Sequence, residues 1–92
     1  MLTCSVVVRG RVQGVGYRMA MVEAARARGI SGWVRNRRDG TVEAVVQGDE
    51  ASIRQLLEWC RRGPPASRVT GLATRELDAD PALLTFDFRP TG

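Results

Sequence analysis

The stretch from Gly10 to Arg18 holds the residues best suited to chemistry in this chain. Three glycines fall within seven positions, between an apolar run and an alanine-rich run. Glycine lets the backbone take positive φ and expose its N–H groups, and a loop of this kind before a helix favours an anion, above all phosphate. Arg18 would add a planar, permanently charged group that pairs with phosphate through two parallel hydrogen bonds. A glycine-rich turn followed by a surface arginine has the same pattern, so this stretch alone leaves both interpretations open.

The residue types that the chain lacks limit the chemistry it can perform. It has no histidine, and all fourteen of its basic residues are arginine. Histidine bases, serine–histidine and cysteine–histidine pairs, lysine Schiff bases and histidine metal ligands are therefore excluded. Any catalysis must use arginine, carboxylate, amide, hydroxyl or backbone groups.

Composition predicts one small cytosolic domain, 1–92, with a single core. The start of the chain has no basic region and no cleavage site, and no apolar run is long enough to cross a membrane. Cys4 and Cys60 lie far apart and form no Cys-x-x-Cys pair, so we expect buried free thiols rather than zinc ligands or a disulfide. The net charge of +4 favours anionic partners but does not distinguish a phosphate ligand from a nucleic acid.

Hydrophobic patterning predicts the elements that must position the loop. In chain order they are strand 2–9, helix 17–28, strand 30–37, strand 41–47, a helix from the cap Asp49 to about residue 62, strand 68–77 and a short strand at 84–88. Asp39-Gly40 between two β-patterned runs is a strong hairpin signal. The order β-α-β-β-α-β is the ferredoxin-like plan of the α+β class, here an antiparallel sheet with two helices on one face and a short extra C-terminal strand. This fold hosts many functions and decides none of them.

The same patterns predict which side chains face the core. Strand 41–47 is expected to direct Val42, Ala44 and Val46 inward and to direct Glu43 and Gln47 to the other face. The other expected stripes are Leu2, Cys4, Val6 and Val8 in the first strand, Tyr17, Met21, Ala24 and Arg28 with Ala25 beside them in the first helix, and Ile53, Leu56, Leu57 and Cys60 in the second helix. The face of the first helix is the least defined, because so many of its residues are small.

A second motif gives the sequence its resemblance to a family. Residues 32–42 read Gly-Trp-Val-Arg-Asn-x-x-x-Gly-x-Val, and residues 10–18 read Gly-Arg-Val-Gln-Gly-Val-x-aromatic-Arg. Together with Gly-Pro-Pro-x-x-Arg-Val at 63–69, the chain resembles the acylphosphatase family over nearly its whole length. One departure is Tyr17, where phenylalanine is commoner in the family.

The resemblance implies hydrolysis of acyl phosphates to a carboxylate and inorganic phosphate, with no metal or other cofactor. Arg18 is then the phosphate-binding arginine and Asn36 the catalytic asparagine. The backbone amides implied to hold phosphate belong to Gln13, Gly14, Val15, Gly16, Tyr17 and Arg18. The partner is a small-molecule acyl phosphate, inorganic phosphate or sulfate could occupy the same site, and a monomer with no nucleic-acid or membrane partner is expected.

This chemistry suits the available residues. The leaving group of an acyl phosphate is a carboxylate, whose conjugate acid has a pKa near ~4, so no general acid is needed. What remains is to position the phosphoryl group, stabilise its charge and orient a water. The carbonyl oxygen of an asparagine can accept a hydrogen bond from that water, although the amide cannot remove its proton. We hypothesise that a phosphate oxygen of the substrate or the solvent takes the proton.

Other features have simpler interpretations. Arg35, Arg37 and Arg38 could guide an anionic substrate, but a solvated charged surface is the ordinary reason for such a run. Asp78 and Asp80 before a proline are typical of a turn, and Trp33 and Trp59 are expected to be packing residues. Two alternatives to the enzyme remain open: a basic RNA-binding module, which the few aromatic residues disfavour, and an inactive anion-binding domain of the same fold.

Overall fold

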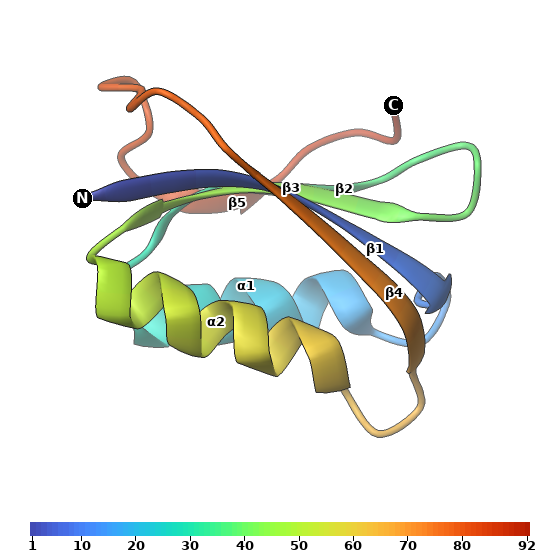
Figure 1. Ribbon diagram of the computed structural model, residues 1–92. Coiled ribbons are helices and arrows are strands. Elements are labelled where there is room, and N and C mark those ends of the chain that lie inside the picture. The colour runs from blue at the N-terminus through green and yellow to red at the C-terminus, as the bar shows by residue number, and fades with distance from the viewer.

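The computed structural model describes residues 1–92, and its elements follow the predicted order with ends that differ by one or two residues. The elements are β1 (Leu2–Arg11), α1 (Tyr17–Ala27), β2 (Ser31–Asn36), β3 (Val42–Gly48), α2 (Glu50–Arg62), β4 (Arg68–Glu76) and β5 (Phe86–Phe88). Both helices lie on one face of the sheet, as Figure 1 shows. This is the ferredoxin-like α+β arrangement.

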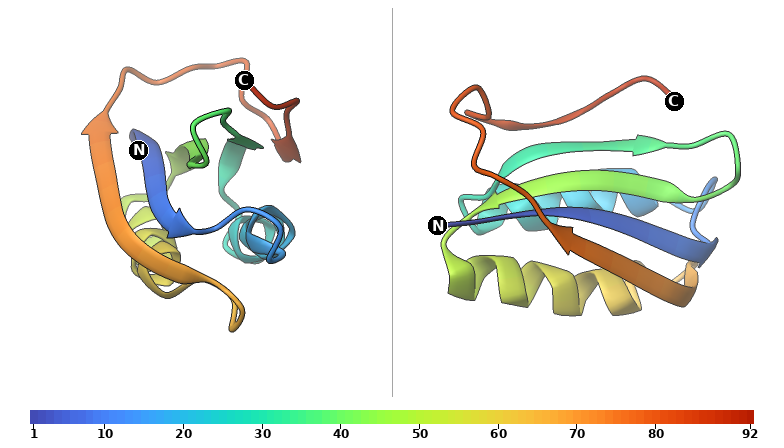
Figure 2. Two further views of the ribbon diagram at one scale, coloured as in Figure 1. Left: turned by 90° about the vertical axis from the view of Figure 1, so that its right-hand side faces the viewer. Right: turned by 45° about the horizontal axis from the view of Figure 1, so that its top comes forward.

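The five strands form one sheet in the order β4-β1-β3-β2-β5. The four strands of the basic fold pair antiparallel, as predicted. The short extra strand β5 instead pairs parallel with β2, so the sheet as a whole is mixed. The cause is the segment 77–85, which carries the chain from the β4 edge to the opposite edge of the sheet (Figure 2, right). From β5 the last residues continue along β2, where the N–H groups of Arg89 and Gly92 donate to the carbonyl oxygens of Val34 and Asn36.

The core lies between the sheet and the helices. Cys4, Val6 and Val8 of β1 are buried as predicted, and so are Val42, Ala44 and Val46 of β3. In α2 the predicted stripe is confirmed for Ile53, Leu56 and Cys60, with Leu57 partly buried. Both cysteines are free and buried.

The predicted buried face of α1 was wrong in part, whereas Gln47 lies on the predicted face of β3 but is covered. The buried residues of α1 are Tyr17, Met21, Val22 and Ala25, because small side chains left the rotation of this helix to be set by tertiary packing. Gln47 is only 5% exposed although it lies on the face away from the helices, since the segment 77–85 covers that end of the sheet. The side-chain oxygen of Gln47 accepts hydrogen bonds from the Thr3 hydroxyl and the Asp80 N–H, and its NH₂ donates to the Asp80 carbonyl.

Neither helix has the length and apolar character needed to span a membrane.

Candidate active site

The loop between β1 and α1 presents backbone donors that nothing in the chain accepts. Gly14 and Gly16 have φ of 73° and 80°, values that side chains disfavour, and Gly16 is the N-cap of α1 with no side-chain cap. The N–H groups of residues 13–19 donate to no acceptor of the protein, and the first intrahelical bond starts at Ala20. By contrast, the side chain of Asp49 caps α2 by accepting from two backbone N–H groups. Only α1 therefore begins with a free cluster of donors at its positive dipole end.

Arg18 adds a full positive charge beside this loop. It lies in the first turn of α1, is partly buried, and makes neither an ion pair nor a side-chain hydrogen bond with the protein. A cavity of about 160 Å³ adjoins it, lined also by Gly14 and Gly16 and, from β5, by Phe88. An unpaired guanidinium and unpaired amides thus face one hollow, which is a suitable arrangement for an oxyanion.

Asn36 is the last residue of β2, and its side chain has an unusual environment. Its Oδ1 is buried without a hydrogen-bond partner, a condition that only one other side-chain atom shares, Arg28 Nε. Side chains alternate along a strand, so Asn36 shares the helix-facing side with Val34, which pairs with Phe88 of the cavity wall. No hydrogen bond joins Asn36 to Arg18, and Asn36 is not among the residues that line the cavity. A buried acceptor without a partner costs about 1–3 kcal/mol, and such atoms are rare enough to suggest a role.

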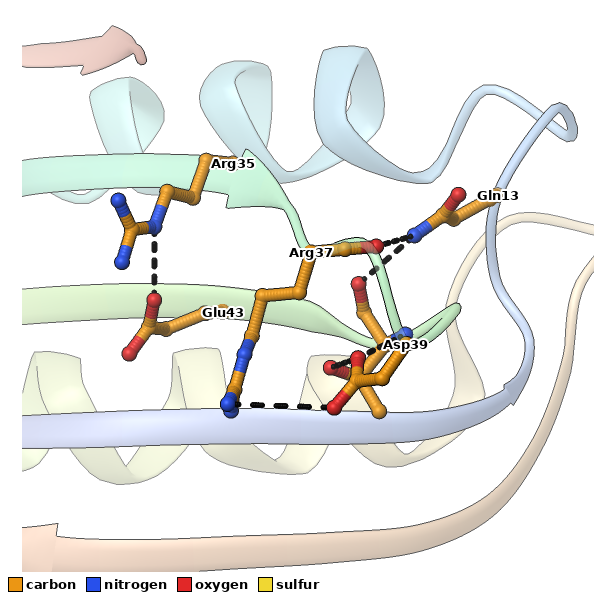
Figure 3. Close-up of polar contacts among 6 residues, drawn as sticks. Gln13, Arg35, Arg37, Asp39 and Glu43 are labelled. Carbon is orange, nitrogen blue, oxygen red and sulfur yellow. Dashed lines mark hydrogen bonds and ion pairs between the residues drawn. The ribbon is translucent and has the colours of Figure 1, made fainter. Parts of the chain in front are cut away.

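The side chain of Gln13 ties the loop to the hairpin that follows Asn36, as Figure 3 shows. Its Nε2 donates to the carbonyl oxygens of Arg37 and Thr41, at 2.7 and 2.9 Å. The hairpin itself is closed by Asp39, whose Oδ1 accepts from the N–H and hydroxyl of Thr41. These bonds hold the pKa of Asp39 below its ordinary value. Segments from the two sequence motifs are therefore joined at one end of the sheet.

Comparison with known proteins decides the family. A family model described as Acylphosphatase matches residues 4–88. The chain belongs to the acylphosphatase family. It is 57% identical over 74 residues to an acylphosphatase of Bordetella parapertussis, which covers 80% of this chain and 79% of that one. It is 49% identical to an acylphosphatase of Acidiphilium cryptum over the full length of both chains.

Solved structures of acylphosphatases have the same fold. The crystal structure of the Bacillus subtilis acylphosphatase superimposes with a TM-score of 0.93 at 36% identity, over 97% of this chain and 99% of that one. The family members are hydrolases, and so is this chain. The predicted family and fold are thus confirmed, and the roles expected of Arg18, Asn36 and the loop amides stay predictions.

The one departure from the acylphosphatase motif has a structural consequence. The hydroxyl of Tyr17 donates to the carbonyl oxygen of Cys60 at 2.7 Å, in a fully buried position. Cys60 lies in the last turn of α2, where carbonyl groups lose their intrahelical partners. The added hydroxyl therefore satisfies an otherwise unpaired carbonyl and joins the start of α1 to the end of α2, while its ring packs against Trp59 at 5.4 Å.

The remaining candidate residues of the sequence are structural or lie on the surface. Arg35 pairs with Glu43 at 2.7 Å, and Arg37 approaches Asp39 at 3.9 Å, so two of the three hairpin arginines have carboxylate partners. Trp33 does not join the core: Arg35 and Arg89 lie over its ring at 5.2 and 4.7 Å. Asp80 forms the predicted turn, its carboxylate accepting from the N–H of Ala82. The chain gathers no group of three or more His, Cys, Asp or Glu side chains that could hold a metal ion.

Two parts of the site were not predicted from the sequence. The Gln13 side chain was expected to contribute only its backbone amide, and its partners lie 24 and 28 residues away in the chain. The apolar wall of the cavity, made by Met19 and Phe88, was also missed. The available signal was the position of Gln13 inside the motif, but no local pattern specifies a hydrogen bond to a distant hairpin.

Proposed function

We propose that this chain hydrolyses acyl phosphates to a carboxylate and inorganic phosphate, with the loop amides and Arg18 binding the phosphoryl group and Asn36 orienting the water. The observation that carries this proposal is the row of free N–H groups at residues 13–19 next to the unpaired Arg18. A phosphoryl group supplies the acceptors that these donors lack. The chain has no histidine or lysine that could serve the same reaction in another way.

In the proposed reaction the protein positions and stabilises rather than exchanging protons. The water oxygen forms a bond to phosphorus while the bond from phosphorus to the acyl oxygen breaks, and the carboxylate leaves with the electron pair. The proton of the water passes to a phosphoryl oxygen or to solvent. Arg18 and the amides offset the charge on the equatorial oxygens, which is the main catalytic contribution in phosphoryl transfer. The weakly basic carboxylate needs no acid to leave.

The orphaned Oδ1 of Asn36 supports its assigned role. The carboxamide oxygen can accept a hydrogen bond from the attacking water, and no group of the protein occupies that acceptor. In the proposed complex that hydrogen bond satisfies the acceptor that the protein itself leaves without a partner. The site thus has a group that gains a missing hydrogen bond when the water is in place.

The alternative functions have less support. A base-stacking platform needs exposed aromatic faces on the sheet, but the ring of Trp33 is covered by Arg35 and Arg89. An inactive anion-binding domain would keep the loop and Arg18 but would have no use for an unsatisfied Asn36. The monomeric state and the cytosolic location stay predictions.

The test is steady-state hydrolysis of benzoyl phosphate with excess chelator present. Arg18→Ala should lower kcat/KM by about 100- to 1000-fold and weaken inhibition by inorganic phosphate, because it removes a donor to the developing charge. Asn36→Ala should lower kcat by about 100-fold while phosphate inhibition stays near the wild-type value. Arg38→Ala is the control, since it removes one exposed positive charge near the site without altering the cavity.

Three results would contradict the proposal. A wild-type protein that binds phosphate but turns over no acyl phosphate would be an anion-binding domain. Loss of activity with the chelator would indicate a metal-dependent enzyme. An Asn36→Ala variant with wild-type kcat would show that the carboxamide does not orient the water.

A further inference from the structure

Two of the largest exposed apolar side chains flank the proposed phosphate site. Met19 is 57% exposed and Phe88 is 45% exposed, and both line the cavity that Arg18 adjoins. Met19 follows Arg18 in the first turn of α1, whereas Phe88 ends β5 on the far side of the hollow. Single exposed apolar residues are common on proteins, but two that converge from separate elements on a charged cavity are typical of a ligand-binding wall.

The cavity divides into a polar side and an apolar side. The polar side consists of Arg18 and the glycine loop. The apolar side consists of Met19, Phe88 and the buried Val12, and no charged residue other than Arg18 lines the hollow. The cavity has a volume of about 160 Å³. This volume accommodates a phosphoryl group and the first part of an acyl group, so the rest of a larger acyl group would extend along Met19 and Phe88.

We propose that Met19 and Phe88 form an acyl-binding wall, and that this chain prefers acyl phosphates with aryl or branched alkyl groups over acetyl phosphate and over acyl phosphates that carry a second carboxylate. The inference rests on the proposed function, because it assigns the phosphoryl group to Arg18. An aryl group would cover both exposed side chains and remove apolar surface from water. An acetyl group is too small to reach both of them, and an added carboxylate would lose water against apolar atoms without gaining a partner.

The expected selectivity is moderate, because the wall covers only one side of the acyl group. One or two methylene equivalents in a hydrophobic pocket change kcat/KM by about 10- to 200-fold, and a half-open wall belongs at the lower end of that range. We therefore expect kcat/KM for benzoyl phosphate to exceed that for acetyl phosphate by about tenfold. Both values must be normalised to the uncatalysed rates of hydrolysis. The normalised kcat/KM for 4-carboxybenzoyl phosphate, which keeps the ring and adds a charge, should be lower than that for benzoyl phosphate and close to that for acetyl phosphate.

The variants Met19→Gln and Phe88→Ala test the wall directly. Met19→Gln keeps the length of an exposed side chain and removes its apolar character, so its folding should be unaffected. Each variant should lower kcat/KM for benzoyl phosphate about three- to tenfold. It should change kcat/KM for acetyl phosphate less than about twofold. Leu84→Ala is the control, since Leu84 is 83% exposed but does not line this cavity.

The outcomes separate this inference from the proposed function. Equal normalised kcat/KM for benzoyl and acetyl phosphate in the wild type would refute the acyl-binding wall but would still agree with the proposed hydrolase function. An equal loss on both substrates in the two variants would also overturn it, because the residues would then support the loop rather than the acyl group. Absence of turnover on every acyl phosphate would contradict the proposed function itself.

Discussion

Replacement of Gln13 by leucine tests whether the loop must be tied to the hairpin for catalysis. Leucine retains most of the side-chain volume but removes the NH₂ group that donates to the carbonyl oxygens of Arg37 and Thr41 at 2.7 and 2.9 Å. A hydrogen bond contributes about 0.5–1.5 kcal/mol net. Both bonds are part-buried, so water can partly replace them, and the expected loss of stability is about 1–2 kcal/mol. For a domain of this size each kcal/mol lowers the Tm by about 4–8 °C.

The effect on activity should exceed the effect on stability. The hydrogen bonds of the Gln13 side chain connect the loop before Arg18 to the hairpin after Asn36. A shift of about 1 Å between reacting groups lowers the rate by about 100-fold. Gln13→Leu should therefore lower kcat by about 10- to 100-fold, while phosphate inhibition changes little because the loop amides remain.

The assay pairs thermal unfolding with kcat on benzoyl phosphate. Gln13→Glu, which has the same shape but directs a carboxylate at two carbonyl oxygens, should be at least as impaired as the leucine variant. Gln55→Leu is the matched control, because Gln55 is exposed on α2 and makes no side-chain hydrogen bond. Wild-type kcat in Gln13→Leu would refute the reasoning, since the loop and the hairpin would then keep their places without the link.

Three further predictions concern buried groups. Tyr17→Phe removes the donor to Cys60, and we expect a loss of about 1–2 kcal/mol in the free energy of unfolding with kcat within about twofold of wild type; unchanged stability would mean that water satisfies the Cys60 carbonyl. Burial raises the pKa of the Cys60 thiol to about 12, so at pH 8 only about one thiol in ten thousand is ionised. A thiol reagent should leave the folded protein unlabelled and label both Cys4 and Cys60 after unfolding, whereas rapid labelling of the native state would contradict their burial. Because an unfolded thiol ionises above about pH 8.5 and the folded Cys60 does not, stability should fall as the pH rises from about 8.5 toward 12.

Local signals predicted most of the fold. A valine-rich run placed β1, Asp39-Gly40 placed the hairpin, and a clear apolar stripe oriented α2. The face of α1 was partly wrong because alanine and methionine give a weak period, so packing rather than pattern chose Val22. The environment of Gln47 and the parallel pairing of β5 both depend on how the segment 77–85 crosses the end of the sheet, and nothing in the composition of that segment specifies its path.

Some features of the candidate site were also predictable from local sequence, and others were not. The glycines of the loop and the place of Arg18 at the start of α1 follow from short-range chemistry, and the structure has them as predicted. The function of the Gln13 side chain and the convergence of Met19 with Phe88 arise from contacts between distant parts of the chain. Such contacts depend on how distant segments are arranged in space, which the residue pattern of a single segment does not specify.

The position of β1 between β3 and β4 has a consequence for how the chain acquires its structure. Cys4 is paired with Glu76 and Arg11 with Arg68, so one edge of β1 has no partner until β4 joins the sheet. Pairing over such a separation requires a large loop to close before any contact compensates its entropy, which slows folding. Until β4 docks, the valine-rich β1 presents one unpaired edge, and unpaired strand edges favour aggregation.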